Sequence, residues 1–147
     1  MLLYSKPVEY SLRALFFIIK NGSEKAYSGE EIASQEDIPR HYLSKILQKM
    51  VLGKILLSIK GPGGGFKLAK NPDEIPLYDV IGVFEDVEEK LDSCAIGWEK
   101  CSDENPCALH DEYKKVKVNI RSFYESISLS KFAEVSAFKS PSNNEAK

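Results

Sequence analysis

The segment from Ser28 to Gly53 constrains the fold more than any other part of the chain. Ser28 and Glu31 form a capping box, a pattern that begins a short helix. Pro39 then predicts a tight turn followed by a second helix, because proline suits a first helical position, and Gly53 ends that helix. A short capped helix, a tight turn and a second helix, in this order, are typical of a helix-turn-helix.

The second of these helices has one apolar face and one cationic face. Residues 38–70 contain seven Lys or Arg and no Asp or Glu, although the chain has a net charge of −2. A local excess of positive charge is typical of a surface that binds a polyanion, but charge alone fits a solvated basic face about as well. The helix-turn-helix pattern favours DNA, and the candidate contacts on this helix are Arg40, His41, Ser44, Lys45 and Lys49.

Two short β-prone runs follow, ILLSIK and FKLAK, joined by the glycine-rich turn GPGGG. This pattern predicts a β-hairpin, or wing, next to the second helix. Adjacent glycines let the backbone approach another surface closely. A phosphate-binding loop of an NTPase is excluded, because Phe66 follows the glycines in place of the Gly-Lys-Ser/Thr ending. The candidate minor-groove contacts of the wing are Lys60, Gly63, Gly64 and Gly65.

The rest of the chain predicts further helices over residues 7–20, 77–85 and about 106–128. The last of these carries a heptad seam, which predicts a homodimer contact, with packing on its own domain as the alternative. The fold class is therefore mainly α with a small β-wing. The expected divisions are a winged helix-turn-helix domain over 1–85, a cysteine-bearing loop over 86–107, a dimerisation helix with a short C-terminal helix over 108–138, and a disordered tail over 139–147.

All three cysteines lie between Cys94 and Cys107, with Cys101 between them and His110 three residues further on. The N-terminal apolar stretch is interrupted by charges, so neither a membrane span nor a signal peptide is expected, and we expect a cytoplasmic protein with reduced thiols. Thiolates are soft ligands that suit an iron–sulfur cluster, zinc or copper(I). The three cysteines are therefore candidate metal ligands.

Taken in order, SGEEIASQEDIPRHYLSKILQKM, SIKGPGGGFKLAK, the cysteine loop and the seam helix resemble the Rrf-two (Rrf2) family of winged-helix transcription regulators, which includes IscR-like and NsrR-like members. The resemblance covers roughly residues 1–135. It implies a homodimer that binds palindromic promoter DNA, often under the control of a 2Fe-2S or 4Fe-4S cluster. It also implies a fourth cluster ligand: His110 matches the IscR-like histidine, and Glu9 matches the NsrR-like acid contributed by the other subunit.

Three alternatives compete with a cluster-sensing regulator. A regulator of the same family could hold zinc, or could sense oxidants directly with bare thiols. An enzyme is disfavoured, because the chain has only two histidines, far apart in sequence, and no nucleotide-binding fingerprint. A purely structural dimer module is disfavoured by the acid-free stretch 38–70.

Overall fold

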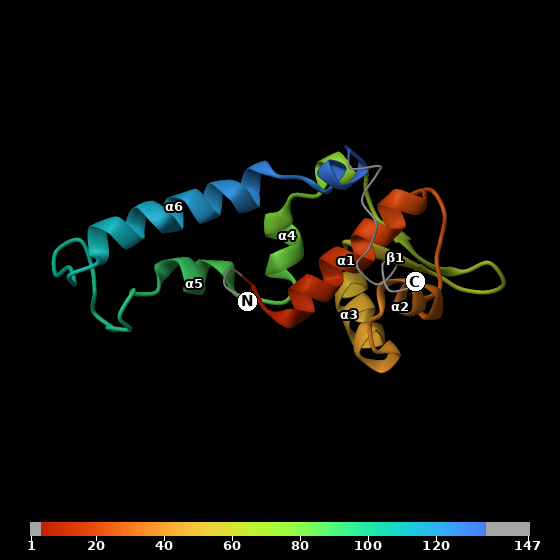
Figure 1. The fold of residues 1–147 in the computed structure, drawn as a ribbon, viewed down its shortest axis with the longest axis horizontal. Coiled ribbons are helices and arrows are strands. Elements are labelled where there is room, and N and C mark those ends of the chain that lie inside the picture. The colour runs from red at the N-terminus through yellow and green to blue at the C-terminus, as the bar shows by residue number, and fades with distance from the viewer. Residues whose placement is uncertain (1–3, 135–147) are drawn as a thin grey trace, which may run out of the picture.

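The computed structural model describes residues 4–134, which form a winged-helix lobe and an arm that extends from it (Figure 1). The lobe contains α1 (Lys6–Asn21), α2 (Gly29–Glu36), α3 (Arg40–Leu52), β1 (Leu56–Ile59) and β2 (Gly65–Leu68). After a short 3-10 helix η1 (Pro72–Glu74) come α4 (Leu77–Gly82), α5 (Val87–Asp92), α6 (His110–Ser126) and the 3-10 helix η2 (Leu129–Glu134). This arrangement confirms the predicted fold class, a mainly helical chain with a small β-wing.

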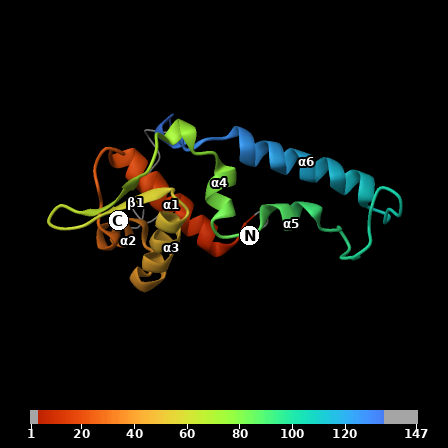
Figure 2. The same ribbon diagram turned by 180° about the vertical axis from the view of Figure 1, so that it is seen from behind.

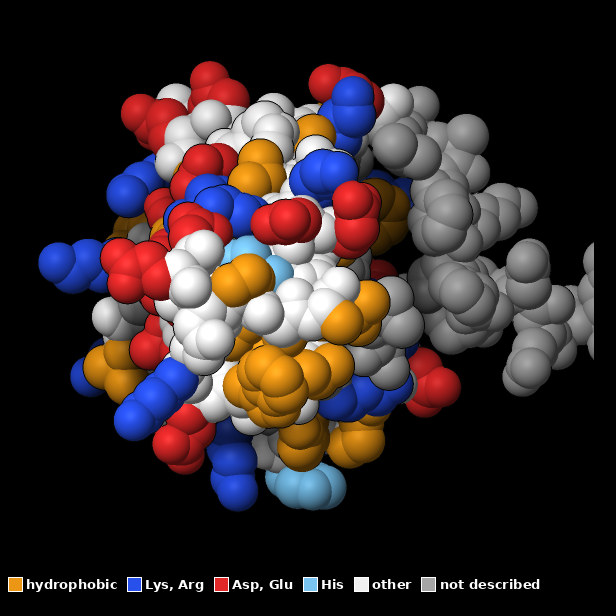
Figure 3. Space-filling view, turned by 90° about the vertical axis from the view of Figure 1, so that its left-hand side faces the viewer, with side chains coloured by type: hydrophobic (Ala, Val, Ile, Leu, Met, Phe, Trp, Pro, Cys, Tyr) orange, Lys and Arg blue, Asp and Glu red, His pale blue; other side chains and the backbone are white. Residues whose placement is uncertain are grey.

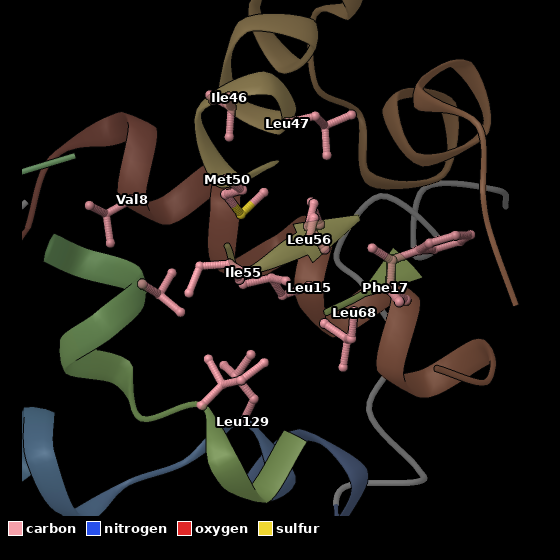
Figure 4. Packing of buried hydrophobic residues seen from close by; sticks show 14 of the residues in the cluster. Val8, Leu15, Phe17, Ile46, Leu47, Met50, Ile55, Leu56, Leu68 and Leu129 are labelled. Atoms are coloured by element: carbon pink, nitrogen blue, oxygen red, sulfur yellow. The ribbon is translucent and has the colours of Figure 1, made fainter. Parts of the chain in front are cut away.

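The core of the lobe forms where α1 and α3 meet the base of the wing (Figure 4). α1 begins with Pro7 in its first turn and ends at Gly22, whose φ of 110° only glycine adopts readily. Its buried face contributes side chains such as Leu15 and Ile18, and α3 contributes Leu47 and Met50, all of them fully buried. The helical spacing seen in the sequence thus becomes one continuous apolar core.

The predicted helix-turn-helix is confirmed in its detail. Ser28 accepts a hydrogen bond from the Glu31 backbone N–H at 3.1 Å, which caps the start of α2. α2 ends at Glu36, and the next residue, Asp37, adopts the left-handed conformation with a φ of 52°. Pro39 then precedes the first residue of α3, so the two helices are separated by a turn of three residues.

The wing is an antiparallel pair in which Leu56 lies opposite Leu68 and Ile59 lies opposite Gly65. Its strand β2 is attached to the segment before α2, because Tyr27 and Phe66 exchange two backbone hydrogen bonds of 2.9 and 2.7 Å. The side chain of Leu56 is fully buried, whereas Leu57 and Ile59 are exposed. One face of the hairpin therefore anchors it to the lobe while its tip projects outward.

The arm consists of α5 and α6 lying alongside each other, with the cysteine-bearing residues at its far end (Figures 1 and 2). Two details differ from the sequence expectation. Residues 86–107 are not loop throughout, since they include α5, which Asp86 caps and which buries Val87 and Leu91. The long helix starts at His110 rather than near residue 106, because the segment around Cys107 turns inward toward the other cysteines.

The end of the described chain returns to the lobe. The Leu77 N–H donates to the Ile127 carbonyl at 2.8 Å, and the Leu129 N–H donates to the Ile75 carbonyl at 2.9 Å. Leu129 is fully buried, and Phe132 packs edge-on against Phe16. The predicted short helix over residues 129–138 appears as η2 up to Glu134, and its remaining residues, like the expected tail over 139–147, lie outside the described residues.

None of the helices described between residues 4 and 134 has the length and apolar character that crossing a membrane requires.

Candidate functional site

The exposed face of α3 carries the polar side chains that the sequence analysis assigned to DNA. Leu43, Ile46 and Leu47 point into the core, which leaves the opposite face of the helix in solvent. His41, Ser44, Lys45 and Lys49 are all exposed there, together with Arg40 at the start of the helix. One surface of α3 therefore presents a row of donors and positive charges.

Two of these cations have partners within the chain. The Arg40 guanidinium lies 3.6 Å from the Glu30 carboxylate of α2, with both side chains 71% exposed. The Lys49 ammonium lies over the Phe84 ring, 6.0 Å from its centroid. Both contacts lie at the surface and contribute little to stability, so either side chain can leave its partner and bind a phosphate group instead.

The wing glycines divide into two groups that sequence reasoning had treated alike. A Cβ on Gly65 would lie 2.2 Å from the Tyr27 carbonyl oxygen, and one on Gly64 would lie 2.2 Å from the Ile59 carbonyl oxygen. The fold itself therefore requires glycine at both positions. Gly63, with a φ of 74°, has open space where its Cβ would be. Lys60 and Gly63 are exposed at the tip, whereas Gly64 and Gly65 are partly buried.

The heptad seam of α6 is divided between two environments. Ile120 and Ile127 pack against the core, and Tyr113 lies over α5 with Ile120. The other three seam residues, Leu109, Val116 and Phe123, are 51%, 48% and 41% exposed. One flank of the seam therefore packs on its own chain, and the other flank forms an exposed apolar stripe, so the homodimer contact stays a prediction.

The three cysteines gather at the tip of the arm. The sulfur atoms of Cys94, Cys101 and Cys107 all lie within 4.8 Å of one another, and those of Cys94 and Cys107 are 3.7 Å apart. Cys107 is buried, while the other two are partly exposed. Two thiolates that share a tetrahedral ion at about 2.3 Å lie roughly 3.8 Å apart. The sulfurs are therefore already close enough to bind a common metal.

The pKa values of two of the thiols are shifted in opposite directions by their surroundings. The pKa of Cys94 is lowered to about 7, mainly because the Ile96 backbone N–H and then the Trp98 N–H donate to its sulfur. The pKa of Cys101 is raised: the Cys107 backbone N–H favours its thiolate, but burial and the two neighbouring sulfurs outweigh that effect. Cys94 thus ionises more readily than Cys101 near neutral pH.

His110 lies directly beside the sulfurs. Its Nδ1 is 3.1 Å from the Cys101 sulfur, and its Nε2 is 2.9 Å from the Asp103 carboxylate. The Lys114 ammonium donates to both oxygens of Asp103, at 2.8 and 2.9 Å. The predicted ligand His110 is therefore brought to the cysteine cluster, together with an acidic and a basic neighbour that the sequence analysis had not identified.

Glu9 lies in the first turns of α1, and its carboxylate is 3.2 Å from the Lys6 ammonium. α1 belongs to the lobe, whereas the cysteines lie at the far end of the arm (Figure 1). Within one chain the fold therefore separates Glu9 from the sulfurs. Its predicted role as a ligand requires a second chain, as the sequence resemblance also implies.

The donor set of this tip fits a metal centre. Three thiolates and one imidazole match the four-coordinate preference of zinc and also the ligands that hold iron in iron–sulfur clusters. Seen end-on, the tip shows apolar side chains among charged groups of both signs (Figure 3). Among the exposed large apolar residues are Ile96, Trp98 and Leu109, all close in sequence to the cysteines.

Comparison with known proteins agrees with these features. A profile of the Rrf2 family, described as an iron-dependent transcriptional regulator, matches residues 4–135. An HTH-type transcriptional regulator of Aquifex aeolicus is 35% identical over 130 residues, which cover 87% of this chain and 89% of the relative. The HTH-type transcriptional regulator IscR of Aliivibrio salmonicida is 29% identical over 121 residues, 82% of this chain and 70% of the relative.

Solved structures share the fold. CymR, the global cysteine regulator of B. subtilis, superposes with a TM-score of 0.76 at 24% identity, covering 91% of this chain and 98% of its own. IscR of T. potens superposes with a TM-score of 0.71 at 22% identity, covering 97% of this chain and 91% of its own. At these identities the likeness concerns the fold, and it extends over both the lobe and the arm.

Proposed function

The chain belongs to the Rrf2 family of transcriptional regulators, and from that premise we propose that it binds promoter DNA as a homodimer under the control of a metal centre at the tip of its arm. Regulators of this family are DNA-binding proteins and not enzymes. We place the protein in the cytoplasm with its DNA. The single observation that carries the regulatory part is the convergence of three cysteine sulfurs within 4.8 Å, beside His110.

The DNA would be read by α3 and the wing together. An α-helix fits the major groove, where exposed side chains meet base edges and phosphates. Ser44 and Lys45, in the middle of the exposed face, are the candidates for base contacts, and Arg40 and Lys49 for phosphate contacts. The wing tip would lie along the minor groove, whose narrow form attracts cations such as Lys60.

The homodimer would form along the exposed flank of α6. Leu109, Val116 and Phe123 recur every seven residues and leave an apolar stripe in solvent. A second copy related by a two-fold axis would cover this stripe with its own. That symmetry would also present two copies of α3 to a palindromic site.

The metal centre would be held by Cys94, Cys101 and Cys107, with His110 as the fourth ligand. An iron–sulfur cluster is the first candidate, because the matched family is described as iron-dependent and relatives include IscR proteins. Such a group, when bound, would supply a redox- or ligand-sensitive centre. A single zinc ion is the second candidate. The separations between the sulfur atoms favour zinc, because thiolates that share one ion lie closer together than thiolates bound to different irons.

Polar contacts connect the arm to the lobe, and these could transmit a change at the tip. Arg121 of α6 donates two hydrogen bonds of 2.8 Å to Glu88 of α5, and the Tyr78 hydroxyl of α4 donates to the same carboxylate at 2.6 Å. Glu85 accepts a hydrogen bond from the Ser5 backbone N–H, at the start of α1, at 2.6 Å. A shift of α5 or α6 would therefore reach α1, on which α3 packs, and would change the balance between DNA-competent and incompetent dimers.

The test is to measure iron, acid-labile sulfide and zinc in protein purified without oxygen, and to measure its DNA affinity before and after metal removal. Iron with matching sulfide, and a DNA affinity that changes on removal, is the expected result. Zinc in stoichiometric amount would select the second candidate. Control by a metal centre would be ruled out if two samples bind DNA as tightly as the parent protein: the parent freed of its metal, and a variant with all three cysteines changed to serine.

A further inference from the structure

We propose that Asp103 and Lys114 are positioning residues for the metal centre, which hold the His110 ring so that its Nδ1 faces the cysteine sulfurs. This inference rests on the proposed metal centre and extends it to two residues that would bind no metal themselves. It also selects His110 over Glu9 as the fourth ligand within each chain.

The hydrogen-bond partners of the His110 ring decide which of its two nitrogens carries no proton. An ionised carboxylate only accepts hydrogen bonds, so the His110 Nε2, 2.9 Å from Asp103 Oδ1, must carry the proton and donate. A neutral imidazole has one proton, and its Nδ1 is then left with a lone pair. That lone pair is directed at the sulfur cluster, 3.1 Å from Cys101. The ring therefore presents the tautomer that a metal bound by the cysteines would require.

Asp103 is itself held in place. The Lys114 ammonium donates to both of its carboxylate oxygens, and Lys114 lies four residues after His110 on α6, so the two side chains share one face of the helix. The carboxylate is thus fixed between two side chains of a single rigid element. The His110 side chain is only 14% exposed, whereas the Asp103 side chain is 71% exposed. His110 therefore lies between the sulfur atoms and Asp103, and Asp103 faces solvent.

Such an arrangement has a known effect on metal sites. A histidine that binds a metal commonly donates its second ring N–H to a carboxylate, which orients the ring and makes the ligand more basic. Loss of the carboxylate partner typically weakens metal binding by about 10- to 100-fold. Because Asp103 is exposed and partly screened by solvent, we expect an effect near the lower end, about tenfold.

The experiment measures how fast protein purified without oxygen releases its own metal to an excess of chelator. Five single variants are compared with the parent chain: Asp103→Ala, Asp103→Asn, His110→Ala, Lys114→Met and Glu104→Gln. Glu104→Gln is the matched control, since it removes one negative charge from the adjacent exposed residue. Asp103→Ala should release metal about tenfold faster. Asp103→Asn keeps an acceptor oxygen and should restore most of the difference, while Glu104→Gln should match the parent.

A double variant distinguishes positioning from a general effect on the loop. If Asp103 acts through His110, then Asp103→Ala should cause no further loss of metal content or of retention in a His110→Ala background. Lys114→Met should change release in the same direction as Asp103→Ala, but by less. Equal release from the parent and Asp103→Ala, or an effect that persists without His110, would overturn the inference. A parent protein that holds no metal would instead refute the proposed metal centre.

Discussion

The winged-helix lobe and the tip of the arm are stabilised by different interactions. In the lobe, side chains such as Leu15, Leu47 and Met50 are fully buried in one apolar core. Between residues 93 and 109, Cys107 is the one buried residue, and the contacts are hydrogen bonds and close sulfur atoms. Apolar burial stabilises the lobe whatever the chain binds. The tip has little apolar burial, so the metal that we propose for its cysteines would supply much of its order.

This difference suits a sensor. A part of a protein that responds to a ligand must come from its less stable elements, because the ligand can shift only an equilibrium that is nearly balanced. In the proposed function, the lobe must keep α3 in a fixed position so that this helix can read DNA. The two regions are therefore expected to respond very differently to mutation, metal removal and pH.

The largest effect is expected in the core of the lobe. Leu47→Ala should lower the free energy of unfolding by about 2–5 kcal/mol, because it leaves a cavity under α3. Leu52→Ala is the matched control in the same helix, since Leu52 is 83% exposed, and it should change stability by less than about 0.5 kcal/mol. Denaturant unfolding measures both. Equal effects would show that the lobe does not depend on this core.

Metal removal should affect the tip and spare the lobe. After chelation, backbone amides in residues 93–109 should exchange hydrogen nearly as fast as an unstructured chain, because few buried side chains hold them. Amides of α1 and α3 should keep their protection. Hydrogen exchange with mass spectrometry separates the two regions, and a loss of protection spread evenly over both would show that metal removal does not act on the tip alone.

The wing offers a comparison within the lobe. Gly63→Ala should cost roughly 1 kcal/mol, the price of a left-handed backbone for a residue with a Cβ. Gly65→Ala should cost clearly more, because its Cβ would also collide with the Tyr27 carbonyl that anchors the hairpin. Thermal unfolding of both variants tests the order. A reversed order would mean that the wing is not held in place by the Tyr27–Phe66 pairing.

DNA binding should depend on the charge of α3 and not on positive charge in general. Lys45→Met should weaken binding to duplex DNA by about tenfold, and it should lower the slope of log affinity against log salt by about 1. Lys54→Met removes the same charge from an exposed residue two positions after the end of α3 and should have much less effect. A titration series at several salt concentrations gives both quantities, and equal losses from the two variants would argue against α3 as the reading helix.

The smallest effect is expected at Glu88, one of the polar contacts that connect the arm to the lobe. Hydrogen bonds from Arg121 and then from Tyr78 lower the pKa of Glu88 to about 2. A depressed carboxyl pKa contributes stability that is present above the ordinary value of 4.5 and is lost as the pH falls from 4.5 toward 2. Glu88→Gln should remove this part of the acid sensitivity and little else, because the pair is at the surface. Between pH 2 and 6, the thermal stability of the variant should depend less steeply on pH than that of the parent chain. An unchanged pH dependence would mean that the Glu88 contact does not contribute to stability.

Several features followed from the sequence alone because they depend on local interactions. The capping box at Ser28, the turn before Pro39 and the glycine-rich hairpin are set by backbone preferences within a few residues. The cysteines were recognised as candidate ligands from their clustering and from the softness of sulfur. These features were enough to predict the winged helix-turn-helix and the location of the candidate metal site.

Other features were decided only by tertiary structure, because they depend on residues far apart in the chain. The requirement for Gly65 comes from a strand pairing with Tyr27, and the division of the α6 seam depends on which flank meets α5 and the core. The role proposed for Asp103 could not be predicted from the sequence, because an acidic residue near a cysteine in a loop is common. Only the folded chain brings the Asp103 carboxylate to His110. Local preferences fix where helices and turns occur, but contacts between distant segments decide which side chains meet.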